Sequence, residues 1–164
     1  MTGADWIWDL AGAMEGRLRL YWIGGNEGVT AEAAQKLVER YPGLEVHTDH
    51  GFHERSGEED DACIARINQV APHIVLVGMG TPTQELWVAE RRERIHAPVV
   101  WCLGATADFI SGRVSRVGPD WLVSKHEWVS RLLADPGRLW KRYLVGNAVF
   151  LARIGRDKLR AFNP

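Results

Sequence analysis

The segment that most constrains the fold is the run from His73 to Glu85. Four consecutive apolar residues, Ile74 to Val77, end in Gly78-Met79-Gly80, and a helix start follows at once. Unbroken apolar runs rich in β-branched residues and bounded by glycine are typical of strands buried on both faces, as in parallel sheets. Ligands of such sheets bind beyond the carboxyl ends of the strands, where helix N-termini attract anions. The segment therefore predicts a parallel sheet with a site for a phosphorylated ligand at its edge.

Gly80 and Gln84 are candidate residues of that site. Glycine lets the backbone approach a ligand closely. Gln84 has a second interpretation, because Thr81 as N-cap and Gln84 three residues later match a capping box, which stabilises a helix by about 1 kcal/mol. A side chain in that position still lies at the anion-binding end of the helix. The sequence leaves both roles of Gln84 open.

Strand-like and helix-like segments alternate through the first two thirds of the chain. Alternation of this length indicates βαβ units with right-handed crossovers and a parallel, Rossmann-like sheet flanked by helices, hence an α/β fold class. The helix after the second strand has a further capping box at Ser56 and Glu59. The predicted strands are 19–23, 44–47, 73–77 and 99–103. The predicted helices are 30–40, 82–95 and, between them, one that the Ser56 capping box opens and whose apolar face carries Cys63, Ile67 and Val70.

The pattern changes after residue 112. No strand signal follows, and helices are predicted from Pro119 to Ala134 and, with Asp135-Pro136 as N-cap and first residue, to about Ile154. Residues 1–112 contain 9 Lys and Arg against 17 Asp and Glu, whereas residues 113–164 contain 11 against 4, so their net charges are −8 and +7. We therefore expect an α/β body at 1–112 and a basic helical appendage at 113–164 that packs on the same domain.

The basic appendage indicates an anionic partner: a nucleotide diphosphate, a lipid headgroup or nucleic acid. Its arginines, Arg131, Arg138 and Arg142, are interleaved with Trp128, Trp140 and Tyr143. A solvated basic face is the usual interpretation of such a run, but the mixture of aromatic and basic residues favours phosphate at a membrane surface. No nucleic-acid recognition motif is present, so nucleic acid is not expected as a partner.

Several classes of protein are disfavoured. The acidic N-terminus has no signal peptide and no apolar run of roughly 20 residues is present. Cys63 and Cys102 lack motif spacing and indicate reduced core thiols of a cytoplasmic protein. His47, His50 and His53 lie three residues apart in a loop without further ligands, so no metal is predicted. The turn at residues 24–28 matches neither the dinucleotide nor the ATP fingerprint, so no cofactor is predicted.

Asp108 and Arg116 follow the last predicted strand. Asp108 is placed to hydrogen-bond a sugar or to act as a base, with a helix cap or a partner for Arg113 or Arg116 as the alternative. Arg116 can pair with a phosphate through two parallel hydrogen bonds, a geometry that suits the guanidinium group.

Taken together, these segments resemble the WecG/TagA/CpsF glycosyltransferases (glycosyltransferase family 26). Each motif alone is weak, but their order and spacing over about 130 residues are specific. The matching pieces are Tyr41-Pro42-Gly43-Leu44, Val77 to Pro82 with Gln84-Glu85 and Trp87, Gly104 with Asp108-Phe109-Ile110 and Gly112, Arg116 with Pro119 and Trp121, Glu127-Trp128 with Arg131-Leu132, and Pro136 with Arg138 to Tyr143.

The resemblance implies transfer of a sugar, typically N-acetylmannosamine, from a UDP donor to an undecaprenyl-diphosphate-linked acceptor. Such transfer serves teichoic acid, common antigen or capsular polysaccharide synthesis, without a metal, at the cytoplasmic membrane face. It implies that Gly80, Gln84, Asp108 and Arg116 line the donor site. It also implies that Arg131, Arg138 and Arg142, in the appendage, handle the diphosphates.

One departure from the family matters for catalysis. Family members carry an N-terminal portion with a Thr-x-Asn segment and an Asp-Gly segment that holds the catalytic aspartate, and nothing in this sequence matches either. The catalytic residue is therefore unassigned, with Asp108 as the candidate within these residues. The alternative to an active enzyme is a catalytically incomplete module that binds a UDP-sugar or a lipid phosphate. The sequence leaves a homo-oligomer open.

Overall fold

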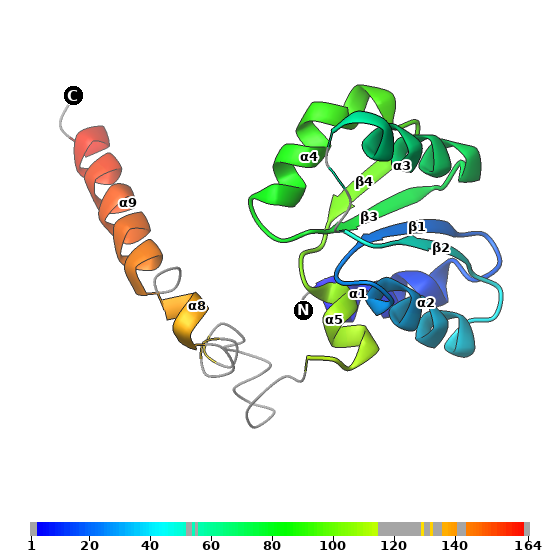
Figure 1. Ribbon diagram of the computed structural model, residues 1–164. Coiled ribbons are helices and arrows are strands. Elements are labelled where there is room, and N and C mark those ends of the chain that lie inside the picture. Colours follow the sequence, from blue (N-terminus) through cyan, green and yellow to red (C-terminus); the bar gives the residue numbers. More distant parts are fainter. Residues whose placement is uncertain are drawn as a thin grey trace. The chain divides into compact units, whose positions relative to one another are not determined.

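The computed structural model describes residues 3–51, 54, 56–114, 129, 132, 136–140 and 144–162. The chain forms two compact units, Met1–Ser115 and Arg116–Pro164. Each unit is described by itself below (Figure 1).

The first unit contains a parallel four-stranded sheet in the order β2-β1-β3-β4. The predicted Rossmann-like α/β class is thereby confirmed. In Figure 1, α1, α2 and α5 cover one face of the sheet and α3 and α4 cover the other. The strands are β1 (Arg19–Gly24), β2 (Glu45–Asp49), β3 (Ile74–Gly78) and β4 (Val99–Cys102). The helices are α1 (Gly3–Ala13), α2 (Val29–Arg40), α3 (Gly57–Val70), α4 (Thr83–Arg91), the 3₁₀ turn η1 (Arg92–Arg94) and α5 (Thr106–Ser111).

Alternate residues of the central strand β1 belong to two separate hydrophobic cores, one on each face of the sheet. Leu20 and Trp22 are buried with residues of α1, α2 and α5, whereas Tyr21 and Ile23 are buried with residues of α3 and α4. This period of two is the expected consequence of strand geometry. Strands β1 and β3 are buried on both faces, which explains why their sequences are continuous apolar runs.

The predicted helix 82–95 is shorter than expected. The α-helix ends at Arg91, and residues 92–94 form a 3₁₀ turn. The Arg92 guanidinium donates to the carbonyl oxygens of Ile95 (2.9 Å) and Ala97 (3.3 Å). These contacts turn the chain toward β4, a tertiary effect that helical periodicity does not report.

The predicted capping box at Ser56 and Glu59 is wrong. Ser56 has the extended backbone of an N-cap, but its side chain makes no capping hydrogen bond. The Glu59 carboxylate instead accepts the backbone N–H of Glu54 at 2.8 Å. The Glu59 side chain therefore binds a nearby loop amide and not the N-cap residue that the sequence pattern predicted.

A buried ion pair joins α3 to α4. Asp60 and Arg91 are 2 % and 7 % exposed, and Arg91 Nε lies 2.9 Å and 2.7 Å from the two carboxylate oxygens of Asp60. The indole N–H of Trp87 also donates to Asp60, at 2.9 Å. Removing one member of such a pair leaves a buried charge without its partner, which costs far more than losing an exposed pair.

The second unit contains α8 (Pro136–Trp140) and α9 (Gly146–Phe162). A helix begins at Pro136 as predicted, and helical structure continues beyond the expected end at Ile154. The helix predicted from Pro119 to Ala134 falls largely outside the described residues. None of the described helices is long and apolar enough to cross a membrane.

We expect Asp60→Asn to lower the free energy of unfolding by about 3 kcal/mol, because it removes the buried anion of the pair and leaves Arg91 only the exposed carboxylate of Glu90, at 2.6 Å. Asp61→Asn is the matched control. Asp61 is adjacent, and its side chain is 65% exposed and paired with Arg94 at 2.5 Å, so its loss costs at most about 1 kcal/mol. Urea unfolding followed by tryptophan fluorescence measures both. Equal effects of the two substitutions would contradict the structural role of the buried pair.

Candidate functional site

The sheet order places a topological switch point between β1 and β3. The chain runs from β1 to β2 on one side and then returns past β1 to β3 on the other. The last residues of the two central strands, Gly24 and Gly78, are register partners. In doubly wound sheets the ligand crevice lies beyond the carboxyl ends of the strands at this point.

Four glycines, one at or just after each strand end, line this edge in sheet order: Gly51, Gly24, Gly78 and Gly104. We call them the glycine row. A Cβ atom on Gly24 would lie 2.4 Å from the Gly78 carbonyl oxygen, and one on Gly78 would lie 2.7 Å from that of Gly104. A Cβ atom on Gly51 would lie 2.9 Å from the Cα of Gly24. The strand ends therefore approach backbone to backbone, at distances that exclude any side chain.

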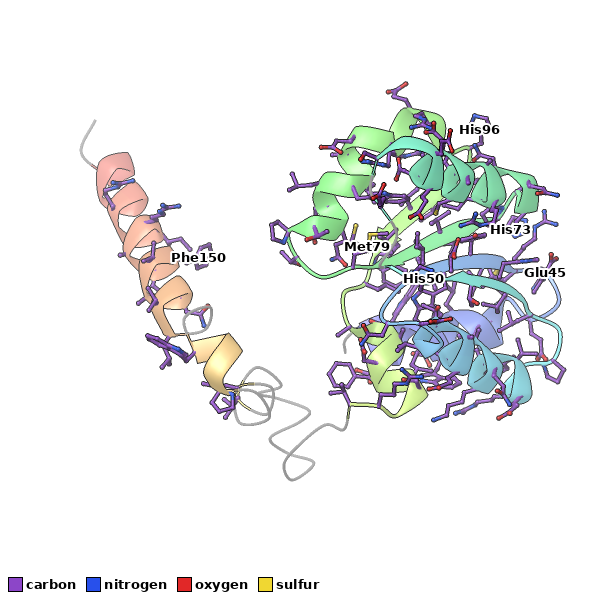
Figure 2. All side chains as sticks on the ribbon, in the orientation of Figure 1. Glu45, His50, His73, Met79, His96 and Phe150 are labelled. Carbon is purple, nitrogen blue, oxygen red and sulfur yellow. The ribbon has the colours of Figure 1, made fainter. Side chains whose placement is uncertain are left out.

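Backbone hydrogen bonds fix the glycine row. The amide of Gly25 donates to the Gly78 carbonyl oxygen at 3.1 Å, and the amide of Gly51 donates to the Gly25 carbonyl oxygen at 3.0 Å. Gly25 follows Gly24 directly, so both bonds lie at the edge that the row lines. Figure 2 shows Met79, the residue after the row's Gly78, and His73 at opposite ends of β3.

Gln84 connects two of the loops at this edge. Its side chain is 3 % exposed, and Oε1 accepts the Gly104 N–H at 3.0 Å while Nε2 donates to the Glu85 carboxylate at 2.7 Å. The predicted capping box is wrong, because Pro82 is the N-cap and no side chain caps α4. The Gln84 side-chain oxygen, which the capping box would place at the helix start, accepts instead from the amide of Gly104, twenty residues away.

Gly80, on the loop after β3, and Asp108, in the helix α5 that follows β4, both come after strands of the same edge. Gly80 has a left-handed φ of 79° and an exposed backbone, and a Cβ atom placed on it would meet no atom within 4 Å. Asp108 is half-buried in the first turn of α5, and the described residues give its carboxylate no hydrogen bond. Of the alternative roles for Asp108, capping is excluded because no side chain caps α5.

Arg113 pairs with Glu32 rather than with Asp108. Its Nη2 and Nε atoms donate to the two carboxylate oxygens of Glu32 at 2.6 Å and 2.9 Å. These hydrogen bonds lower the pKa of Glu32 and raise that of Arg113. Arg113 also donates to the Glu27 carbonyl oxygen at 3.4 Å, so it holds the loop after β1 to the chain that follows α5.

A polar cluster that the sequence did not reveal lies between β1, β2 and α3. Asp49 ends β2, and its Oδ2 atom accepts from Tyr21 Oη at 3.2 Å and from Arg66 Nε at 3.0 Å. Burial, followed by the charge of Asp49, raises the pKa of Tyr21 far above its usual value. Burial likewise raises the pKa of the nearby Cys63 to about 12, so this thiol is neutral at physiological pH. The sequence feature that could have indicated this cluster is Asp49, an aspartate at the carboxyl end of a strand.

The predicted phosphate-binding arginines belong to the less described part of the chain. Arg116, Arg131 and Arg142 lie outside the described residues, and only the backbone of Arg138 is described, within α8. Their role stays a prediction. Of the three histidines considered above, His53 also lies outside, and His47 hydrogen-bonds Glu45 at 2.9 Å. No group of three or more potential ligands capable of holding a metal occurs among the described residues.

The parallel sheet, the switch point and the glycine row together define a doubly wound α/β domain of the Rossmann-like class. The chain belongs to the glycosyl transferase WecG/TagA/CpsF family, whose pattern it matches over residues 1–164.

Among curated proteins, the chain is similar to the N-acetylglucosaminyldiphosphoundecaprenol N-acetyl-beta-D-mannosaminyltransferases of Staphylococcus aureus strains NCTC 8325 and MRSA252. It is 27% identical to each over 142 residues, which are 85% of this chain and 53% of the relative. The chain thus spans about half the length of these curated relatives.

We expect Gly78→Ala to destabilise the first unit by about 2 kcal/mol or more, because its Cβ atom would meet the Gly104 carbonyl oxygen and force the strand ends apart. Gly155→Ala is the control: it lies in α9 with no neighbour within 4 Å of its Cβ position. That change favours the helix by about 1 kcal/mol. Thermal unfolding measures both variants. A fully stable Gly78→Ala protein would show that the strand ends are not in close contact.

Proposed function

We propose that this chain forms the donor-binding part of a glycosyltransferase that moves a sugar from a UDP donor to an undecaprenyl-diphosphate-linked acceptor. The product would enter a cell-surface polysaccharide or teichoic acid. N-acetylmannosamine is the expected sugar, because the relatives named above are N-acetylmannosaminyltransferases. The observation that carries the proposal is the glycine row, in a chain that belongs to this family over its length.

The glycine row suits a diphosphate for a physical reason. With no side chains at the strand ends, a ligand can approach main-chain atoms at the switch point. The helices that follow, α2 and α4, begin near this edge, and their N-termini favour negative charge. Gly80 lies on the turn that precedes α4, Gln84 lies in the first turn of α4, and Asp108 lies in the first turn of α5. We assign these three residues, together with Arg116, to the donor.

Sugar transfer then needs two contributions from side chains: stabilisation of the leaving group's charge and removal of a proton. Negative charge builds on the departing UDP, and cationic side chains that are already in place stabilise it. We assign this role to Arg131, Arg138 and Arg142. A base must also take the proton of the attacking acceptor hydroxyl. Asp108, whose carboxylate has no hydrogen bond from the described residues, is the candidate within this chain.

A second function follows if Asp108 does not act as the base. The described residues then hold the donor site without a catalytic base. In that case the chain binds a UDP-sugar or a lipid phosphate without turnover. The two functions differ in one observable, the release of UDP in the presence of an acceptor.

Two measurements distinguish these outcomes. Titration calorimetry measures the binding of UDP and of UDP-N-acetylmannosamine. A second assay measures the release of UDP in the presence of a short polyprenyl-diphosphate-linked N-acetylglucosamine as acceptor. Binding with turnover supports the transferase and makes Asp108→Asn the next variant. Binding without turnover supports the incomplete module. Absence of binding would refute both.

Gln84→Ala should weaken UDP binding by about tenfold, because Gly104 loses the acceptor that fixes its loop at the site. Gln35→Ala is the matched control. Gln35 is exposed on α2 and hydrogen-bonds only the carboxylate of Glu39, at 2.8 Å, among the contacts described. Calorimetry gives the affinities and thermal unfolding gives the stability of each variant. Unchanged affinity of a folded Gln84→Ala protein would remove Gln84 from the donor site.

We also propose that the second unit contacts the membrane that carries the acceptor, at the cytoplasmic face. On α9, Phe150, Leu151 and Ile154 are 61%, 66% and 40% exposed, and they share one side of the helix at 100° per residue. Arg153 and Arg156 lie on the same helix. Figure 2 shows the position of Phe150 on α9. Apolar residues next to cations suit an anionic bilayer surface.

Phe150→Glu should therefore reduce co-sedimentation with vesicles of phosphatidylglycerol and phosphatidylcholine several-fold, since it adds a charge to the apolar side. Ala152→Glu adds the same charge about 200° around the helix and should retain most of the binding. Equal binding by both variants and the parent protein would show that α9 is not the membrane-contacting element.

A further inference from the structure

Glu85, an exposed residue in the first turn of α4, accepts two hydrogen bonds at one carboxylate oxygen. Its Oε1 atom accepts from Gln84 Nε2 at 2.7 Å and from Thr81 Oγ1 at 3.1 Å. Thr81 lies in the loop that follows β3, and Gln84 lies in the first turn of α4. The Glu85 carboxylate therefore joins this loop to the helix that it enters.

Gln84 extends the connection to a second loop. Its Oε1 atom accepts the Gly104 N–H at 3.0 Å, and its backbone N–H donates to the Gly80 carbonyl oxygen at 2.9 Å. Gly104 follows β4 with a left-handed φ of 58°, at the start of the turn that leads into α5 and to Asp108. A continuous set of hydrogen bonds thus runs from Glu85 through Gln84 to the loop after β4.

The two side-chain partners of Gln84 specify the same orientation of its amide. A glutamine amide has one acceptor oxygen and one donor nitrogen. The Gly104 N–H needs the oxygen, and the Glu85 carboxylate needs the nitrogen. The opposite orientation would place two donors against each other at Gly104 and two acceptors against each other at Glu85. Because a hydrogen bond to a charged group is stronger than one between neutral groups, Glu85 holds the amide more firmly than Gly104 does.

The charge of Glu85 also acts on the end of β4. Burial, followed by this negative charge, raises the pKa of the Cys102 thiol. Cys102 is the last residue of β4. The carboxylate therefore lies near the carboxyl ends of β3 and β4, the edge to which the donor is assigned above.

We propose that Glu85 is a positioning residue of the donor site. It holds the Gln84 amide in one orientation, and Gln84 in turn holds the loop that begins at Gly104 and leads to Asp108. Side chains that bind a ligand need partners of this kind to keep their geometry. Without Glu85 the Gln84 amide can rotate, and the loop after β4 loses its fixed attachment to α4. This inference rests on the proposed function, because the donor site is itself proposed.

Titration calorimetry of the full chain with UDP tests the role of Glu85. We expect Glu85→Ala to weaken UDP binding about fivefold. Glu85→Gln should restore most of that affinity, because its side-chain oxygen still accepts from Gln84. Glu39→Ala is the matched control. Glu39 accepts the same kind of hydrogen bond from Gln35, at 2.8 Å on α2, and its loss should leave UDP binding unchanged.

A double variant distinguishes positioning from direct contact with the donor. If Glu85 acts through Gln84, Glu85→Ala should change the UDP affinity less than about twofold in a chain that already carries Gln84→Ala. An equal loss in both backgrounds would mean that Glu85 contacts the donor itself, and would overturn the positioning role. A Glu85→Ala protein that binds UDP as tightly as the parent chain would overturn it as well.

Amide hydrogen exchange tests the same connection without a ligand. We expect the Gly104 amide to exchange several-fold faster in Glu85→Ala than in the parent chain, and at the parental rate in Glu85→Gln and Glu39→Ala. Unchanged exchange at Gly104 in Glu85→Ala would overturn the inference, whether or not UDP binds. The proposed function fails differently: a parent chain that binds no UDP refutes it together with the donor role of Glu85.

Discussion

The contact on which the first unit depends is the close approach of Gly24, Gly78 and Gly104 at the carboxyl edge of the sheet. These strand ends meet through main-chain atoms, with no side chain between them. That contact keeps β1, β3 and β4 in register up to their last residues and determines where the following loops begin. The helices α2, α4 and α5 start from those loops, so their positions also follow from it.

Side-chain contacts then hold the helices against this frame. The Asp60–Arg91 pair joins α3 to α4, and Arg113 ties the chain after α5 to Glu32 on α2. Most polar groups near the edge are occupied in this way, because buried polar atoms need partners. Asp49 is bound by Tyr21 and Arg66. The edge therefore offers mainly backbone groups and the half-buried Asp108.

The sequence predicted the sheet and the positions of the helix starts well and the capping hydrogen bonds poorly, for one physical reason. Apolar runs such as Ile74–Val77 report burial directly, because a strand between two helical layers has no polar face. Capping motifs report only local competition for hydrogen bonds. In the folded protein the side chains of Gln84 and Glu59 accept hydrogen bonds from the loop amides of Gly104 and Glu54 instead. The cluster of Tyr21, Asp49 and Arg66 was missed because its members come from three separate elements, and α1 was not among the predicted helices.

The glycine row has a consequence for how such a protein diversifies. The row itself offers a ligand only peptide groups, and peptide groups are the same whatever the neighbouring side chains are. Under the proposed function the row binds the diphosphate that all nucleotide diphosphates share, and it does not distinguish one attached sugar from another. Selection for a new sugar must act on the loops beyond it, including residues 25–28 and 79–82. A chain that differs from its relatives at most positions can in this way keep the proposed anion site unchanged.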